Sequence, residues 1–389
     1  MSIPQSPRST RRADQRRRSR RRAVLVGGVL AAIVVGGVGA FALTTSDGLD
    51  ERAEPKRPKV TTTTLPPTTT TTRDPRRGLN VPVTIAFAGD VHFEGPIRTK
   101  LAENPSVMFA PIAPVLSSTD IAMVNFESAI TEQNTPIPKQ FNFKSPTSAL
   151  VALQAAGVDL VNQANNHSVD FGPQGLADTI AAKATSPIPI IGVGNNATEA
   201  YTPFLTEVRG QRIAIFGATD VMGEEHVASW TATDTQAGIA STKYEAEARM
   251  IASIQAVRPL VDTLVVFLHW GVEAIGCATD RQKALARALV DAGADIVVGS
   301  HAHVLEGGGR LGTAFVGYGL GNFSFYNEAG ENGRTGVLIV TITGRDTDAY
   351  QWVPARIRGG IPTPLPAGPE ADAEVAHWNE LRACTDLTP

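Results

Sequence analysis

Apolar runs alternate with amphipathic stretches along most of the chain. Five apolar runs predict buried strands, at residues 83–90, 121–127, 159–167, 263–271 and 294–303. Helical periodicity predicts helices at residues 111–118, 148–156, 173–184, 243–257 and 280–291. This alternation of strands and helices is typical of an α/β protein with a largely parallel sheet.

The pattern changes after residue 310. Residues 313–318, 336–343 and 350–357 predict sequential strands without helices between them, which suggests a second, antiparallel or mixed sheet. Further short strands are predicted at residues 188–193 and in a hairpin that turns at Arg209 and Gly210. We expect residues 81–360 to form the main domain and residues 361–389 to form a C-terminal tail with a short helix.

The segment that precedes this domain has a different composition. Residues 1–22 contain nine arginines, residues 23–43 are an uncharged apolar run of 21, and residues 44–80 are rich in Thr, Pro and charged residues. This composition predicts a basic cytoplasmic tail, one transmembrane helix and a flexible stalk. The positive-inside rule then places the domain outside the cytoplasmic membrane, with a single membrane anchor.

A cleaved signal peptide is the alternative to a retained anchor. Residues 40–42 (Ala-Phe-Ala) resemble a cleavage site, and residues 19–21 (Ser-Arg-Arg) loosely resemble a twin-arginine signal. The apolar run is longer than the roughly 7–15 residues of most signal peptides, which favours the anchor. Both alternatives place the domain outside the cytoplasm.

Charge and cysteine content narrow the possibilities further. The net charge is −3 although the N-terminal arginine-rich segment is basic, so the domain is acidic and does not predict a nucleic-acid surface. Cys277 and Cys384 both lie in the part predicted to be external. They can form one disulfide in an oxidising compartment, and two free thiols are the alternative.

Side chains that can bind metals follow the predicted strands. They include five of the seven histidines and are Asp90, His92, Glu127, Asn166, His167, His269, His301 and His303. Because the carboxyl ends of parallel strands meet at one edge of a sheet, we expect these residues to converge. Imidazole and oxygen ligands in this number suit two divalent ions that share a carboxylate, with Mn²⁺ or Zn²⁺ preferred and Fe as a further candidate.

Structural roles remain alternatives for several of these residues. Asp90 and Asn165 can serve as turn residues, Glu127 as a helix-capping acid and His269 as a core histidine. Trp270 is interpreted as packing beside the site.

Six motifs occur in a fixed order across about residues 81–345. They are Gly89-Asp90, Asn125-Phe126-Glu127, Asn165-Asn166-His167 with Asp170 and Gly172, His269-Trp270-Gly271-Val272-Glu273, Gly299-Ser300-His301-Ala302-His303, and Gly319-Leu320-Gly321-Asn322-Phe323. This set resembles the CapA (PgsA-type) capsule and poly-γ-glutamate synthesis proteins, within the calcineurin-like metallophosphoesterase superfamily. The resemblance implies a four-layer αββα sandwich with two mixed β-sheets.

The resemblance also implies roles for individual residues. Asp90, His92 and His303 would hold one ion, Asn166, His269 and His301 the other, and Glu127 would bridge them. His167 would be the catalytic acid. Supporting or substrate-contacting roles fall to Asn125, Asn165, Asp170, Trp270, Glu273 and Asn322. In three places the chain departs from related patterns: Glu127 stands where the wider superfamily has Asp, His92 restores an Asp-x-His that many CapA relatives lack, and Ala302 replaces a frequent proline.

Two functions from different classes fit these features. The ligand set favours a metal-dependent phosphoesterase-type hydrolase that acts on an anionic polymer or a phosphoester of the cell envelope. The anchor and stalk favour a non-catalytic accessory protein beside membrane proteins of polymer synthesis or export.

Overall fold

The computed structural model describes Asp74 and residues 76–389. The predicted basic tail (1–22), the predicted transmembrane segment (23–43) and most of the predicted stalk (44–80) lie outside the described residues. Within the described part, no helix has the length and apolar character needed to cross a bilayer.

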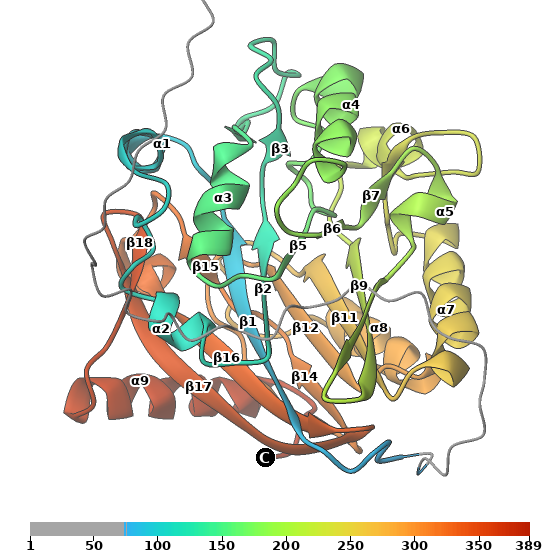
Figure 1. Ribbon diagram of the computed structural model, residues 1–389, viewed down its shortest axis with the longest axis vertical. Coiled ribbons are helices and arrows are strands. Elements are labelled where there is room, and N and C mark those ends of the chain that lie inside the picture. Colours follow the sequence, from blue (N-terminus) through green and yellow to red (C-terminus); the bar gives the residue numbers. More distant parts are fainter. Residues whose placement is uncertain (1–73, 75) are drawn as a thin grey trace, which may run out of the picture. The chain divides into compact units, whose positions relative to one another are not determined.

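Two mixed β-sheets form the centre of the described region (Figure 1). The first has the order β18 (Ile361–Pro364), β17 (Asp346–Arg358), β16 (Arg334–Thr343), β1 (Val83–Val91), β2 (Ile121–Phe126), β5 (Leu160–Asn162) and β6 (Ile190–Ile191), with β15 (Asn322–Ser324) beside β1. The second has the order β13 (Gly308–Leu311), β14 (Ala314–Gly317), β12 (Ile296–His301), β11 (Thr263–Trp270), β9 (Gln211–Thr219) and β8 (Phe204–Val208). Two short pairs complete the strands: β3 (Ala129–Ile130) with β4 (Lys144–Ser145), and β7 (Val193–Gly194) with β10 (Gly238–Ile239).

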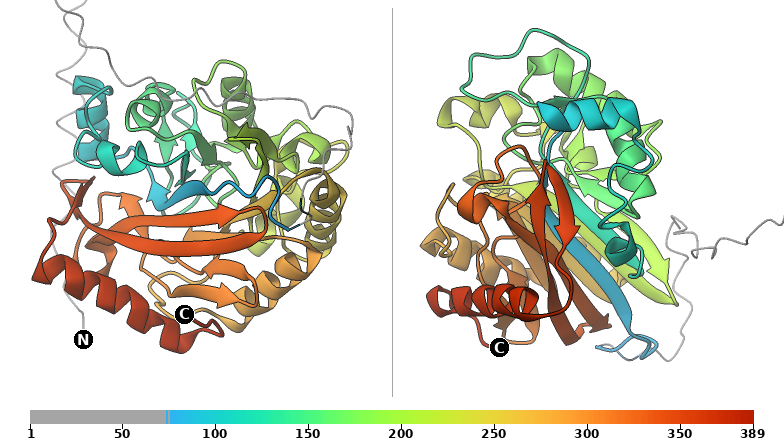
Figure 2. Two further views of the ribbon diagram at one scale, coloured as in Figure 1. Left: turned by 60° about the horizontal axis from the view of Figure 1, so that its bottom comes forward. Right: turned by 90° about the vertical axis from the view of Figure 1, so that its left-hand side faces the viewer.

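Successive side chains of the central strands point to opposite faces of the sheet and so belong to different apolar layers. In β1, Ile85 and Phe87 pack between the two sheets, whereas Ala86 and Ala88 face the helices. The helices on the first sheet include α1 (Pro96–Glu103), α2 (Ala113–Leu116), α3 (Ser148–Ala155) and α4 (Gly172–Lys183). Those on the second include α5 (Ala197–Ala200), α7 (Glu245–Val257) and α8 (Asp280–Ala292), while α6 (Val227–Trp230) lies in the β9–β10 connection. The order of layers is therefore helix, sheet, sheet, helix (Figure 2).

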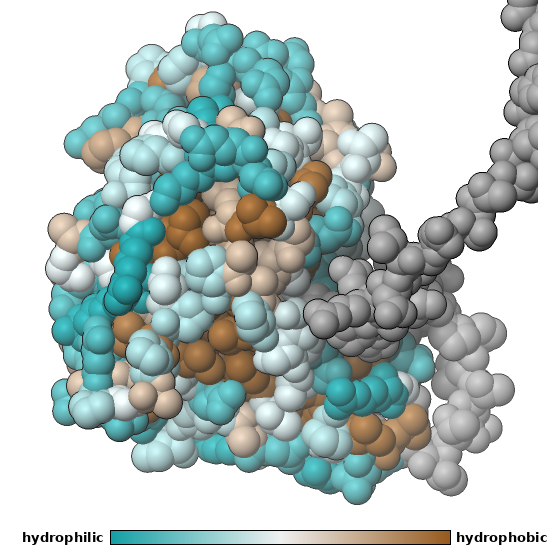
Figure 3. Space-filling view, turned by 60° about the vertical axis from the view of Figure 1, so that its left-hand side comes forward, coloured by the Kyte–Doolittle hydropathy of each residue, from teal (hydrophilic) through white to brown (hydrophobic). Residues whose placement is uncertain are grey.

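The surface contrasts with these interior layers. On the face shown in Figure 3, hydrophobic residues form separate small patches among hydrophilic ones. The large apolar side chains of the central strands are instead fully buried.

The predicted mixed α/β architecture is present, with local differences. The run 159–167 forms a strand only at β5, because the side chains of Asn162 and Asn165 accept hydrogen bonds from the Ala164 and His167 backbone N–H groups (both 3.1 Å) and turn the chain. The helix predicted at residues 111–118 is confined to α2, and α1 was not predicted. The late strands do not make a sheet of their own. In the first sheet, β16 pairs antiparallel with β1 and β17 pairs antiparallel with β16, whereas β14 joins the second sheet.

The C-terminal segment is built into the same unit. Strand β18 pairs with β17, and α9 (Pro369–Glu380) carries Trp378, which stacks on Trp352 at 5.5 Å. Cys277 and Cys384 form a disulfide. Residues 361–389 therefore pack on the domain rather than trailing from it.

Candidate metal centre

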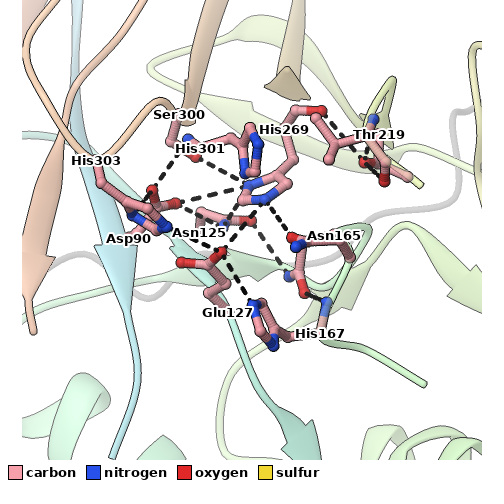
Figure 4. A network of polar contacts seen from close by, with 12 residues as sticks. Asp90, Asn125, Glu127, Asn165, His167, Thr219, His269, Ser300, His301 and His303 are labelled. Carbon is pink, nitrogen blue, oxygen red and sulfur yellow. Dashed lines mark hydrogen bonds and ion pairs between the residues drawn. The ribbon is translucent and has the colours of Figure 1, made fainter. Parts of the chain in front are cut away.

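Strand ends from both sheets meet at one point (Figure 4). Asp90 in β1 and Glu127 directly after β2 come from the first sheet, and His269 in β11 and His301 at the end of β12 come from the second. The His301 backbone N–H donates a hydrogen bond to Asp90 Oδ2 at 2.9 Å, which joins the two sheets here. Parallel strands with their carboxyl ends at one edge produce this convergence.

Glu127 is the centre of the site. Its Oε1 lies 3.4 Å from His269 Nε2, 3.8 Å from His167 Nε2 and 3.9 Å from His303 Nε2. The carboxylate is fully buried, and neither oxygen has a hydrogen-bond partner. A buried carboxylate without hydrogen bonds is costly, so the arrangement fits a bound cation.

Two groups of side chains can hold metal, and both contain Glu127. One group is Glu127 with His301 and His303, and the other is Glu127 with Asp90 and His269. In each group the ligand atoms lie within 4.8 Å of one another. His301 Nδ1 is also buried without a hydrogen-bond partner, as expected for a ligand atom.

This grouping differs from the one that the resemblance implies, which separates His301 from His303. Both residues have positive φ angles, 105° for His301 and 58° for His303, which are uncommon for residues other than glycine. The chain thus bends sharply after β12, and both rings come within reach of Glu127. Such backbone strain is frequent at functional sites.

The buried charges alter several pKa values. Burial alone would raise the pKa of Asp90, but contact with His303 and His269 outweighs it and holds that pKa below its usual range. Burial and the neighbouring histidines lower the pKa of His301 and leave it neutral, the form that binds metals. Burial also opposes protonation of His303, but Glu127 and Asp90 raise the pKa of His303 to about 9.

Amide side chains orient the ligands. Asn125 Nδ2 donates to Asp90 Oδ1 (2.7 Å) and lies 3.0 Å from His269 Nδ1. His269 Nε2 in turn lies 2.8 Å from Asn166 Oδ1, and His303 Nδ1 lies 2.9 Å from Asn322 Oδ1. Asn165 Nδ2 donates to the Phe126 carbonyl (2.8 Å) and to Asn125 Oδ1 (3.5 Å), which ties the turn to β2. These contacts fix the ring orientations of both histidines.

His167 lies beside the centre with its own carboxylate. Its Nδ1 is 2.6 Å from Asp170 Oδ2, which leaves Nε2 directed towards Glu127. The ring stacks on Phe143 with a centroid distance of 4.1 Å. Lys139, which is missing from the predicted set, binds the other Asp170 oxygen at 2.8 Å. It lies in a Pro-containing loop far from any predicted strand end, and no sequence pattern marks it.

His92 does not belong to either group of potential ligands. Its Nδ1 accepts a hydrogen bond from the Glu94 backbone (3.0 Å), and its Nε2 faces the Tyr326 backbone N–H at 3.3 Å. The ring stacks on the face of Phe143 at 4.6 Å. His92 therefore does not lie among the potential ligands that the structure groups together, and its assignment as a metal ligand stays a prediction.

Two other predicted residues stand apart from the centre. Trp270 is fully buried, donates to the Tyr318 carbonyl (2.7 Å) and packs on that ring, so it is a core residue. Glu273 is exposed on the loop after β11, where its charge contributes to the raised pKa of His303.

The family model described as bacterial capsule synthesis protein PGA_cap matches residues 84–327, which include every potential ligand of the centre. The chain belongs to this family.

Relatives of this PGA_cap chain include proteins of known name. It is 29% identical over 292 residues to the capsule biosynthesis protein CapA of Bacillus anthracis, covering 74% of this chain and 70% of that protein. It is 29% identical over 288 residues to the PGA biosynthesis protein CapA of Bacillus subtilis, covering 73% of this chain and 74% of that protein. A probable polyglutamine synthesis accessory protein of Mycobacterium tuberculosis is 30% identical over 193 residues, which is 48% of this chain and 50% of that protein. Among solved structures, a hypothetical protein from Thermus thermophilus is 18% identical with a TM-score of 0.45, covering 70% of this chain and 99% of that one.

Proposed function

We propose that this protein is a metal-dependent, phosphoesterase-type hydrolase in the synthesis of capsule, poly-γ-glutamate or another cell-envelope polymer. The observation that carries the proposal is Glu127, which is buried without a hydrogen-bond partner and shared by two groups of potential ligands. Carboxylate and imidazole donors suit two divalent ions, with Mn²⁺ or Zn²⁺ preferred and Fe as an alternative. The helix–sheet–sheet–helix layers agree with a metallophosphoesterase-like sandwich.

The residues of the centre would have distinct roles in phosphoester hydrolysis. Bound divalent ions would supply neutralisation of the phosphoryl charge and activation of the attacking water. Asp90, Glu127, His269, His301 and His303 would hold them. Outside these ligands, the carboxylate of Asp170 accepts the Nδ1 hydrogen of His167, so that a protonated His167 presents Nε2–H to the leaving-group oxygen.

Relatives and sequence support the biological setting. The Bacillus relatives are named for capsule and PGA biosynthesis. The apolar run at residues 23–43 supports a single anchor in the cell membrane with the domain outside, beside membrane proteins of polymer synthesis or export. The substrate in that setting would be an anionic polymer or a phosphoester.

A non-catalytic accessory role is the second candidate. It is favoured by the printed name of the Mycobacterium tuberculosis relative, a probable accessory protein of polyglutamine synthesis. In this role the centre would bind metal for structure or for docking and would turn over no phosphoester.

One experiment separates these functions. The full chain is purified, its metal content is measured, and hydrolysis of bis(p-nitrophenyl) phosphate and p-nitrophenyl phosphate is assayed with Mn²⁺ or Zn²⁺. We expect His167→Asn to retain metal and lose about 10²–10⁴-fold in kcat, the usual contribution of a general acid. Glu127→Gln should lose both metal and activity, while His226→Asn, a histidine outside the centre, should change neither.

Each outcome decides between the candidates. Metal without hydrolysis of either ester supports the accessory role. A wild-type chain that binds no divalent ion rejects the metal centre and the hydrolase together.

A further inference from the structure

The connection between β3 and β4, here called the cover loop (residues 131–143), is held by the turn that carries His167. Ile137 N–H donates to the Asp170 carbonyl at 2.9 Å, and Phe143 N–H donates to Asp170 Oδ2 at 2.7 Å. Phe143 then stacks on the His167 ring. Asp170 is thus an attachment point of the cover loop as well as the partner of His167.

Lys139 is the only charged side chain that the described part of the cover loop inserts into this turn. Its Nζ donates to Asp170 Oδ1 at 2.8 Å and to the Asn166 carbonyl at 2.6 Å, and lies 3.3 Å from His167 Nδ1. The side chain is 23% exposed and Asp170 is fully buried, so this is a largely buried ion pair. Removing one partner of such a pair leaves an uncompensated charge.

The two Asp170 oxygens have separate tasks because of Lys139. Oδ1 accepts from Lys139, whereas Oδ2 faces His167 Nδ1 and Phe143 N–H. Without the lysine, only the two contacts at Oδ2 would hold the carboxylate, so the orientation of the His167 ring would be less restrained.

Lys139 also acts on the other end of the turn. Its Nζ donates to the Asn166 backbone carbonyl and so restrains that residue. The Asn166 side-chain Oδ1 lies 2.8 Å from His269 Nε2. The Lys139 ammonium group therefore restrains both Asn166 and His167, the two residues of this turn that lie beside the metal centre.

We propose that Lys139 is a positioning residue: it acts through Asp170 to orient His167 and through the backbone to place Asn166. The kinetic part of this proposal rests on the proposed hydrolase function, whereas the structural part does not. Nothing in the role requires Lys139 to touch substrate.

The test compares Lys139→Met with Lys144→Met in the full chain. Lys144 is a matched control because it borders the same loop but hydrogen-bonds to Gln133 O and Asn134 Oδ1. It approaches the segment after His167 at the Phe171 ring, 5.5 Å from Nζ, and not at Asn166, His167 or Asp170. Hydrogen exchange is measured first on the metal-free proteins. We expect Lys139→Met to speed exchange about 10-fold or more at residues 137–143 and 165–172, and Lys144→Met to leave residues 165–170 unchanged.

Kinetics then show how Lys139 acts. We expect Lys139→Met to lower kcat about 10–100-fold with less than about 3-fold change in KM, and Lys139→Arg to recover part of the loss. If Lys139 works through Asp170, the Lys139→Met/Asp170→Asn double variant is no slower than Asp170→Asn alone. Losses that multiply in the double variant would show an independent role and overturn the proposal.

Other outcomes are equally decisive. If the wild type hydrolyses no ester, the hydrolase function fails and hydrogen exchange alone judges the positioning role. If residues 165–172 exchange at the wild-type rate in Lys139→Met, the positioning role is rejected, whether or not the wild type hydrolyses the esters. If Lys139→Met does not fold by circular dichroism, Lys139→Gln replaces it in every comparison with the same expectations.

Discussion

His303 carries the clearest pH dependence at the scale of single residues. Burial opposes its protonation, but Glu127 and Asp90 raise the pKa of His303 from 6.5 to about 9. A raised histidine pKa contributes stability that is complete below pH 6.5 and is lost as the pH rises through 9. We expect the metal-free protein to lose up to about 3 kcal/mol of unfolding free energy over this range, as measured by urea denaturation.

His303→Asn provides the comparison for this pH dependence. The variant lacks the titrating ring, so its unfolding free energy should change less than that of the wild type between pH 6.5 and 9. Parallel pH profiles for the two proteins would show that His303 is not the responsible group.

The sequence predicts which residues approach one another better than it predicts where their side chains point. Asp90, Glu127, His269, His301 and His303 converge because strand direction alone brings their backbones to one edge. The direction of the His92 ring depends instead on two backbone N–H groups, one of them at Tyr326 in a distant part of the chain. Lys139 reaches the site through loop geometry, which hydrophobic periodicity does not encode.

At the scale of elements, α9 is secured to the domain in three ways. Cys384, just beyond the helix, is bonded to Cys277, Trp378 stacks on Trp352, and Glu374 binds Arg334 at 2.7 Å. The disulfide closes a separation of 107 residues, for which chain entropy predicts about 5 kcal/mol. We expect the Cys277→Ser/Cys384→Ser variant to lose about this much unfolding free energy in urea.

The helix itself should remain docked in that variant, because the stacking and the ion pair are unchanged. Hydrogen exchange at residues 369–380 should therefore stay slow under native conditions. Fast exchange there would mean that the disulfide alone holds α9.

Elements with a strong local pattern are those that the sequence predicts well. Strands β1, β2, β11 and β12 are continuous apolar runs, and α8 begins at a capping box of Thr279 and Gln282 and ends at Gly293. The sheet to which a late strand belongs is decided by long-range pairing. Strand β16 pairs with β1, the first strand of the domain, and no local sequence pattern predicts a partner so distant in the chain.

At the scale of the whole domain, the candidate centre links the two sheets. Asp90 and Glu127 belong to the first sheet and His269 and His301 to the second, so a bound ion would connect both halves of the core. A ligand that binds only the folded state stabilises it by RT ln(1 + [L]/Kd), which is about 2.7 kcal/mol at 100 times Kd. Chelation should therefore destabilise the domain as one cooperative unit rather than loosen a single loop.

We expect removal of metal with EDTA to lower the Tm of the wild type, and Mn²⁺ or Zn²⁺ at about 100 times Kd to restore about 2.7 kcal/mol, as measured by calorimetry. Glu127→Gln should show no such metal-dependent change. Glu207→Gln makes the same chemical change at an exposed position of β8 and should respond to metal like the wild type. A Glu127→Gln variant that is still stabilised by metal would place the ion elsewhere, since both groups of potential ligands depend on this one carboxylate.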